Sequence, residues 1–295
     1  MPSGASTAPP TPWTTAGLTA AAMVAFAANS LLCRAALGGG HADPASFTAL
    51  RLLGGAAVLG LLARGRGSVA GRASPWGPAV ALFAYAAGFS FAYTRISAAT
   101  GALLLFAAVQ LTMNGAGLLR GERPRPLEWA GLALALTGLV VLARPGLARP
   151  DPRGAFLMLV AGVAWGLYSL RGRTAAHAVA TNAASFALAL PLAIVAVTAA
   201  ALLGSLRVSS VGVSLALASG VVASGLGYAV WYSALRGLTA TRAAIVQLAV
   251  PPLAAAGAVV FLGESVSRRL LAASVLILGG IALAVGARRP TTSRC

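Results

Sequence analysis

Ten long apolar runs, separated by short links that contain glycine, proline and arginine, account for nearly the whole chain. A helix needs about 20 predominantly apolar residues to cross a bilayer, so each run is long enough to be a membrane span. Only 9% of the residues are charged, far fewer than in a soluble domain. We therefore predict an all-α polytopic membrane protein with ten transmembrane helices at 15–36, 44–63, 76–94, 98–119, 127–143, 154–171, 182–203, 210–234, 239–262 and 269–287.

An internal repeat at an offset of 142 residues relates the two halves of the chain. When residues 96–142 are placed over 238–284, Gly121-Glu122 falls on Gly263-Glu264 and the span boundaries coincide. Each half holds five spans, an odd number, so the second half enters the membrane from the opposite side. We expect two inverted repeats around a central cavity. The expected divisions are an N-terminal tail 1–14, a first repeat 15–143, a linker 144–153, a second repeat 154–287 and a C-terminal tail 288–295.

The net charge of +17 comes from arginines that stand singly or in small groups in the links between spans. Nucleic-acid-binding proteins gather their basic residues on one face or stripe, so this distribution excludes nucleic acid as a partner. Arginines are more numerous in the links on the side of the termini than in those on the other side. By the positive-inside rule, both termini are expected to be cytoplasmic, in a bacterial inner membrane.

The carboxylates all lie in links or at span ends, at Asp43, Glu122, Glu128, Asp151 and Glu264. A membrane-embedded hydrolase or metal enzyme needs acids or histidines inside its spans, and proton-coupled efflux of cationic drugs needs an intramembrane acid. We therefore expect no enzymatic activity, no metal site and no cofactor. The sequence also lacks a Walker motif, so ATP is not expected to drive the protein directly.

Three features together resemble the drug/metabolite transporter superfamily in its ten-helix EamA type. They are the run Trp165-Gly-Leu-Tyr-Ser169, the pair Asp43-Pro44 before a span that carries Arg51, and the repeated unit at 95–142 and 237–284. Within that superfamily the chain is similar to the amino-acid exporters, including the aromatic amino-acid exporter branch. The resemblance implies a basket of ten helices with a central cavity, termini inside, and export of small metabolites. This chain differs from the drug-exporting relatives that carry a glutamate in the first helix, because no acid lies in 15–36.

Arg51 is the only ionised residue placed well inside a predicted span. Two interpretations stay open. The guanidinium faces the cavity and binds a substrate carboxylate, or the side chain reaches the outer membrane interface, which is common for an arginine about two turns inside a span.

Pro251 and Pro252 remove two backbone donors from the ninth span, and we predict a kink with free carbonyls at Gln247 and Leu248. A broken helix offers both acceptors for an ammonium and N–H donors for a carboxylate. The two prolines are therefore hinge candidates, although transmembrane prolines also bend helices only for packing.

The remaining candidates for substrate contact are the amides and aromatic rings inside the spans. They are expected either to line the cavity or to serve helix packing, and Asn29 equally to bridge helices. The set comprises Asn29, Tyr85, Gln110, Asn114, Trp165, Tyr168, Trp231 and Gln247.

These features together predict a secondary transporter that exports amino acids, aromatic and other neutral ones, or similar small metabolites by alternating access. Its expected partners are the small-molecule substrate and membrane lipid, and two halves that already form a pathway favour a monomer. The alternatives are efflux of hydrophobic drugs or toxic metabolites, and a passive channel, for which the spans show no continuous polar lining.

Overall fold

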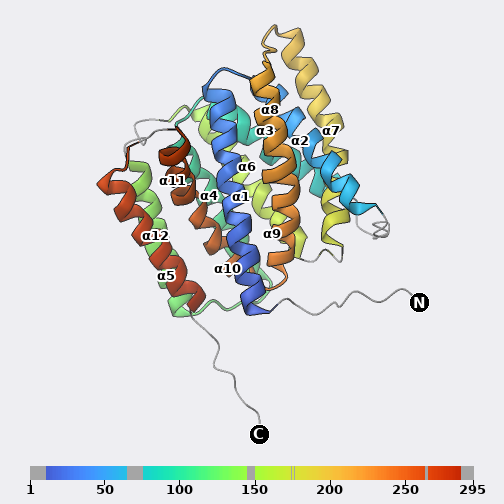
Figure 1. Ribbon diagram of the computed structural model, residues 1–295. Helices are drawn as coiled ribbons and strands as arrows, with labels where there is room; N and C mark the ends of the chain where they lie inside the picture. Colours follow the sequence, from blue (N-terminus) through green and yellow to red (C-terminus); the bar gives the residue numbers. More distant parts are fainter. Residues whose placement is uncertain are drawn as a thin grey trace, which may run out of the picture.

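The computed structural model describes residues 11–64, 76–144, 150–173, 175, 177–262 and 265–286, and the regular structure in these ranges is helical (Figure 1). This confirms the all-α prediction. The elements are α1 Pro12–Gly38, α2 Pro44–Ala63, α3 Trp76–Tyr93, α4 Ala98–Leu119, α5 Pro126–Ala143, α6 Pro152–Arg173, α7 Ala178–Leu202, α8 Ser210–Ala218, η2 Ser219–Leu226, α9 Gly227–Leu235, α10 Ala240–Val246, η3 Gln247–Ala249, α11 Val250–Leu262 and α12 Arg268–Gly286.

The ten predicted spans correspond to these elements, with the eighth and ninth each divided by an irregular turn. The eighth is α8, the π-helical η2 and α9, and the ninth is α10, the 3₁₀ turn η3 and α11. Within the described ranges, nine helical stretches have the length and hydropathy of a membrane span. The tenth, α3, is 18 residues long and carries Trp76, Tyr85 and Tyr93 among its apolar residues.

Helix starts follow the local sequence. Proline occupies the first turn of α2 directly after Asp43, whose carboxylate accepts hydrogen bonds from the Ala45 and Ser46 N–H groups. Ser97 and Thr239 cap α4 and α10 in the same way through their hydroxyls. At the end of α4, Gly121 adopts a φ of 80°, which favours glycine, and turns the chain toward α5.

Packing between the helices repeats when the two halves are exchanged. Helix α3 packs on α6 and α7, and correspondingly the eighth span packs on α1 and α2. Helix α4 packs on α6, as α11 of the ninth span packs on α1. Three pairs join equivalent helices, namely α2 with α7, α4 with α10, and α5 with α12. The two five-span halves are thus structural repeats.

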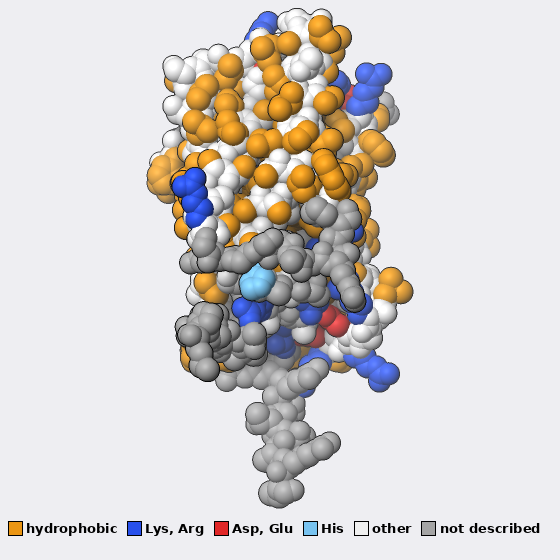
Figure 2. Space-filling view, turned by 90° about the vertical axis from the view of Figure 1, so that its right-hand side faces the viewer, with side chains coloured by type: hydrophobic (Ala, Val, Ile, Leu, Met, Phe, Trp, Pro, Cys, Tyr) orange, Lys and Arg blue, Asp and Glu red, His pale blue; other side chains and the backbone are white. Residues whose placement is uncertain are grey.

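The start of α1 and the end of α12 lie at the same end of the bundle in Figure 1, which we call the termini end. The links α4–α5, α6–α7 and α9–α10 are also at this end, since successive spans alternate in direction. The links α1–α2, α3–α4, α7–α8 and α11–α12 lie at the opposite end. The sides of the bundle between the two ends expose many large apolar side chains (Figure 2), as contact with lipid requires.

Helices α5 and α12 lie side by side at one edge of the bundle (Figure 1) and approach through glycine. A Cβ atom on Gly131 would overlap the carbonyl oxygen of Gly280, and one on Gly280 would meet the carbonyl oxygen of Gly131. In a membrane, such close backbone approach replaces the hydrophobic effect as a source of helix association.

Candidate functional site

Arg51 is buried in the middle of the bundle, with 1% of its surface exposed, and it joins the two halves. From α2 its Nε donates to Ser224 Oγ of η2 at 2.8 Å, and its Nη2 donates to Tyr228 Oη of α9 at 2.6 Å. The guanidinium also lies 5.2 Å from the ring centroid of Tyr85. The side chain therefore does not extend to the membrane interface.

The guanidinium of Arg51 keeps one unused donor. Its Nη1 is buried and has no hydrogen-bond partner among the described residues. No described carboxylate lies within ion-pair distance of Arg51, because the described carboxylates are all in links or at helix ends. A buried cation without a counter-ion is costly in a membrane interior and is a strong binding point for an anion.

A cluster of aromatic rings lies beside Arg51 and comes from four helices, α1, α3, α6 and α9. The Trp165 ring of α6 lies 4.8 Å from Tyr85, 4.9 Å from Tyr228 and 5.2 Å from Phe26, measured between centroids. The Trp231 ring of α9 lies 5.7 Å from the Phe26 ring, again between centroids. These rings fill the region between the halves in this conformation, so a ligand beside Arg51 displaces or reorients at least one of them.

Trp165 and Gln247 connect the cluster to the broken ninth span. The indole Nε1 of Trp165 donates to Gln247 Oε1 at 2.5 Å, and Gln247 Nε2 donates to the Ala243 carbonyl at 2.8 Å. Nearby, Gln110 Nε2 of α4 donates to the Ala244 carbonyl at 2.7 Å. Amides from both halves thus meet where α10 ends.

The break in the ninth span lies just before Pro251 and Pro252. The chain changes from α-helix to one 3₁₀ turn at Gln247–Ala249 and resumes as α11 at Val250. One part of the predicted geometry is wrong, because the Gln247 carbonyl accepts a hydrogen bond from the Val250 N–H and is not free. The tighter 3₁₀ turn supplies a donor that the prolines remove from the α-helical pattern.

Asn114 has the second unused polar atom of the region. Its Nδ2 donates to Gln110 Oε1 at 3.0 Å, while its buried Oδ1 has no partner among the described residues. Gln110 and Asn114 are one helical turn apart on α4, and so face the same way. Among the described residues, the buried side-chain polar atoms without a hydrogen-bond partner are Arg51 Nη1, Asn114 Oδ1 and Thr241 Oγ1.

The π-helical turn η2 contains two buried serines that form hydrogen bonds with the first half. Ser224 accepts from Arg51, and Ser219 Oγ donates to Asn29 Oδ1 at 2.7 Å. Gly220 between them lies against the backbone of Arg51, where a Cβ would overlap its carbonyl oxygen. π-helical turns often occur at functional sites, and this one lets α2 approach closely enough for Arg51 to bond across the halves.

Two candidates, Tyr168 and Trp231, are fully buried and bonded within the second half. Tyr168 Oη donates to Asn182 Oδ1 at 2.6 Å, and Trp231 Nε1 donates to Ser169 Oγ at 3.2 Å. Their hydrogen-bonding groups are therefore occupied. Their rings pack against the cluster, Tyr168 on Trp165 and Trp231 on Phe26.

The structure brings Tyr85, Trp165, Gln247 and Arg51 into one cluster and places Gln110 and Asn114 beside α10. Asn29 bridges α1 and η2. Sequence reasoning did not select Phe26, Ser224 or Tyr228. Tyr228 carries a usable signal, since it stands one turn before Trp231 and Tyr232 in a chain with few aromatics.

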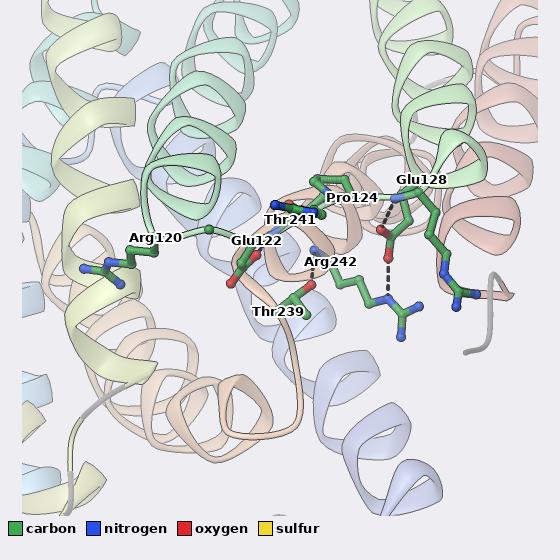
Figure 3. A pocket seen from close by; sticks show the side chains of 10 residues that line it. Arg120, Glu122, Pro124, Glu128, Thr239, Thr241 and Arg242 are labelled. Carbon is green, nitrogen blue, oxygen red and sulfur yellow. Dashed lines mark hydrogen bonds and ion pairs between the residues drawn. The ribbon is translucent and has the colours of Figure 1, made fainter. Parts of the chain in front are cut away.

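The termini end is closed by carboxylates that bind across the halves (Figure 3). Glu122 accepts from the Ala240 and Thr241 N–H groups at 3.0 and 3.3 Å, and from Arg173 Nη1 at 2.9 Å. Burial raises the pKa of Glu122, but these hydrogen bonds together outweigh it, so the pKa lies below the ordinary value. Glu128 accepts from Arg242 Nε at 2.8 Å. The counterpart of Gly121-Glu122 in the second repeat, Gly263-Glu264, lies outside the described residues.

At the opposite end of the bundle, Asp43 in the α1–α2 link joins the first half to the second. Its Oδ2 accepts from the Arg207 N–H of the α7–α8 link at 2.9 Å, while its own N–H donates to the Arg207 carbonyl at 2.7 Å. A β-bridge between Ala42 and Val208 continues this contact. Burial raises the pKa of Asp43, but the hydrogen bonds from Ser46, Arg207 and Ala45 bring it below the ordinary value.

Comparison with known proteins matches both halves of the chain to one family. The model of the EamA-like transporter family matches residues 13–144 and 152–286. The chain is 51% identical over 279 residues to uncharacterized protein PA1977 of Pseudomonas aeruginosa, covering 94% of this chain and 96% of that protein. A segment of 52 residues is 36% identical to the uncharacterized inner membrane transporter YedA of Escherichia coli, covering 18% of this chain and 17% of YedA. A solved crystal structure has the same fold, with a TM-score of 0.71 and 24% identity over 90% of this chain and 98% of the other.

Proposed function

The chain belongs to the EamA-like transporter family, and on this basis we propose that it exports amino acids, aromatic and other neutral ones, or similar small metabolites by alternating access. Membership makes the protein an integral membrane transporter of small molecules and not an enzyme. The proposal adds the cargo, its direction and the residues that bind it.

The observation that carries the proposal is the unused Nη1 of Arg51, buried between the halves with no carboxylate in reach. A substrate carboxylate supplies the missing anion and forms charge-assisted hydrogen bonds in a site of low dielectric constant. The rings of Tyr85 and Trp165 offer faces to an aromatic or aliphatic side chain. The unused Oδ1 of Asn114 provides an acceptor suited to an ammonium.

Bonds that cross between the repeats support the proposal of alternating access. Arg51 binds Ser224 and Tyr228 of the other half, and Gln110 of the first half donates to the Ala244 carbonyl of the second, close to the break before Pro251. A cargo that takes over either set of hydrogen bonds loosens one contact between the halves, and rocking about the midplane then exposes the site to either side. Pro251 and Pro252 serve as the hinge.

The proposed orientation places both termini in the cytoplasm. Arg120, Arg123 and Arg125 lie in the α4–α5 link and Arg173 ends α6, all at the termini end, and arginine in or beside short links favours the cytoplasmic side. The resemblance to YedA, named an inner membrane transporter, supports the bacterial inner membrane. Because the two halves form the site between them, a monomer suffices.

The proposal is tested by the flux of radiolabelled phenylalanine and alanine into liposomes that contain only the purified protein. The wild type should show saturable uptake that the unlabelled amino acids inhibit. Arg51→Gln removes the charge and should raise the KM by about 10-fold or more, since hydrogen bonds to charged groups contribute about 1.5–3 kcal/mol.

Arg34→Gln is the matched control, because Arg34 is an exposed arginine on the neighbouring helix α1 and should leave uptake unchanged. Absence of amino-acid uptake by folded wild-type protein contradicts the cargo assignment. Resistance of cells to hydrophobic toxins would then identify the efflux alternative, and flux without saturation would identify a channel.

A further inference from the structure

A cleft of about 500 Å³ opens at the termini end, away from the midplane cluster (Figure 3). One wall is the α4–α5 link and the first turn of α5, and the other is the start of α10. The lining residues are Arg120, Gly121, Glu122, Arg123, Pro124, Arg125, Glu128, Thr239, Thr241 and Arg242.

The cleft carries excess positive charge. Four of its lining residues are arginines and two are glutamates. Both glutamates are engaged in the protein, Glu122 with Arg173 and the start of α10, and Glu128 with Arg242 and the Arg125 N–H. Arg120 and Arg123 are exposed at its rim. An anion that enters the cleft therefore meets guanidinium groups whose charge the glutamates do not balance.

The cleft also lies at the boundary of the apolar surface. Leu118 and Leu119, which end α4 directly before Arg120, are 47% and 91% exposed. Leu127 and Trp129, which follow Arg125 at the start of α5, are 49% and 42% exposed. Exposed leucine and tryptophan on a membrane protein lie against lipid, with tryptophan typical of the headgroup level. The arginines between these two segments are thus at the depth of lipid phosphates.

We propose that this cleft binds the phosphate headgroup of an anionic phospholipid, with Arg120 and Arg123 as its principal ligands and the acyl chains against the exposed leucines of α4 and α5. Arginine suits this role because its planar donors pair with two phosphate oxygens. Basic pockets between helices on the cytoplasmic side are typical sites for anionic headgroups.

Bound phosphate has a mechanical consequence. The cleft is lined by the α4–α5 link of the first half and by Arg242 of the second, so a phosphate bound between them adds a bridge beside the one that Glu122 makes. The lipid therefore favours the closed termini end. This site is independent of the cargo proposed above, and its test requires no transport measurement.

The test is lipid titration of the full chain in a neutral detergent, read by native mass spectrometry. Phosphatidylglycerol should bind in preference to phosphatidylcholine. The double variant Arg120→Gln/Arg123→Gln should weaken phosphatidylglycerol binding about 25-fold, since one arginine near a membrane surface contributes about 1 kcal/mol, or about fivefold.

The matched control is Arg268→Gln/Arg269→Gln, which removes two adjacent exposed arginines at the opposite end. It should retain wild-type affinity. Equal binding of the two lipids by the wild type, or equal losses in both double variants, overturns the proposal. Displacement of the lipid by millimolar inorganic phosphate assigns the cleft to a free anion and overturns the lipid assignment. A circular dichroism spectrum shows that each variant is folded.

Discussion

At the scale of single residues, Arg51 is stabilised in the bundle without an ion pair. Neutral hydroxyls of Ser224 and Tyr228 and the ring face of Tyr85 surround its charge. A carboxylate at this place would neutralise Arg51 permanently and leave nothing for a ligand to bind. The hydroxyls solvate the guanidinium only in part, so the site stays receptive to an anion.

The Trp165–Gln247 hydrogen bond should contribute measurably to stability. Trp165→Phe removes the indole N–H and leaves Gln247 Oε1 buried with no donor from Trp165. A buried polar group without its partner costs about 1–3 kcal/mol, so the free energy of unfolding in a detergent titration should fall by that amount. Trp129→Phe, at a half-exposed position on α5, is the control and should unfold like the wild type. Equal stability of Trp165→Phe and the wild type contradicts the pairing.

Glu122 should make the protein sensitive to acid. Its pKa is lowered in the folded protein, so its stabilisation is complete above the ordinary pKa of a glutamate, about 4.3, and is lost as the pH falls through the lowered value. In Glu122→Gln the side chain has no carboxylate to protonate. The melting temperature of this variant should therefore fall less than that of the wild type between pH 6 and pH 3, as measured by thermal unfolding in detergent. Asp43 contributes equally to both proteins. An identical acid response in the two contradicts the prediction.

At the scale of elements, the spans could be predicted from the sequence because hydropathy, proline and capping residues act locally. The pair Asp43-Pro44 defines the start of α2, and Gly121 defines the turn after α4. The π-helical turn η2 could not be predicted in this way. It depends on contacts with Arg51 and Asn29, which lie more than 160 residues away in the chain.

The same distinction applies to the candidate site. Rare polar residues in apolar spans, such as Gln247 and Arg51, are visible in the sequence because burial is costly for them. Ser224 is not, since serine is also an ordinary small packing residue in membranes. The bonding role of Ser224 appears only when η2 is placed beside α2.

Two glycine substitutions should have opposite effects on stability, because one glycine lies in the α5–α12 contact and the other faces open space. Gly131→Ala places a Cβ against the Gly280 carbonyl and should lower the free energy of unfolding by about 1–3 kcal/mol. Gly115→Ala in α4 meets no atom within 4 Å, so it should raise stability by up to about 1 kcal/mol through helix propensity. Detergent titration of both variants checks the signs. A neutral or stabilising Gly131→Ala is inconsistent with the close approach.

At the scale of the whole molecule, Asp43 and Glu122 join the two halves at opposite ends. Each carboxylate comes from the first half and binds backbone N–H groups of the second, Arg207 in one case and Ala240 and Thr241 in the other. Alternating access requires that only one of these ends opens at a time. The two carboxylates should therefore affect exposure of the interior differently.

Cys33 provides a native reporter for the opposite end, because it is buried near the end of α1. In a Cys295→Ser background, Asp43→Asn should increase the rate of maleimide labelling of Cys33 about fivefold, as expected from the loss of about 1 kcal/mol of hydrogen bonding. Glu122→Gln loosens the termini end and should not increase it. Equal acceleration by both variants would mean that the ends do not open separately.

The use of backbone donors at these ends has a consequence for how such a chain can evolve. Every residue except proline carries the N–H that Glu122 and Asp43 accept, so substitutions at Arg207, Ala240 or Thr241 leave the attachment available. Selection on these backbone contacts therefore acts on one carboxylate at each end, while the ion pair with Glu122 still constrains Arg173. The residues around Arg51 can therefore change, and with them the cargo, while the backbone contacts that close the two ends are kept.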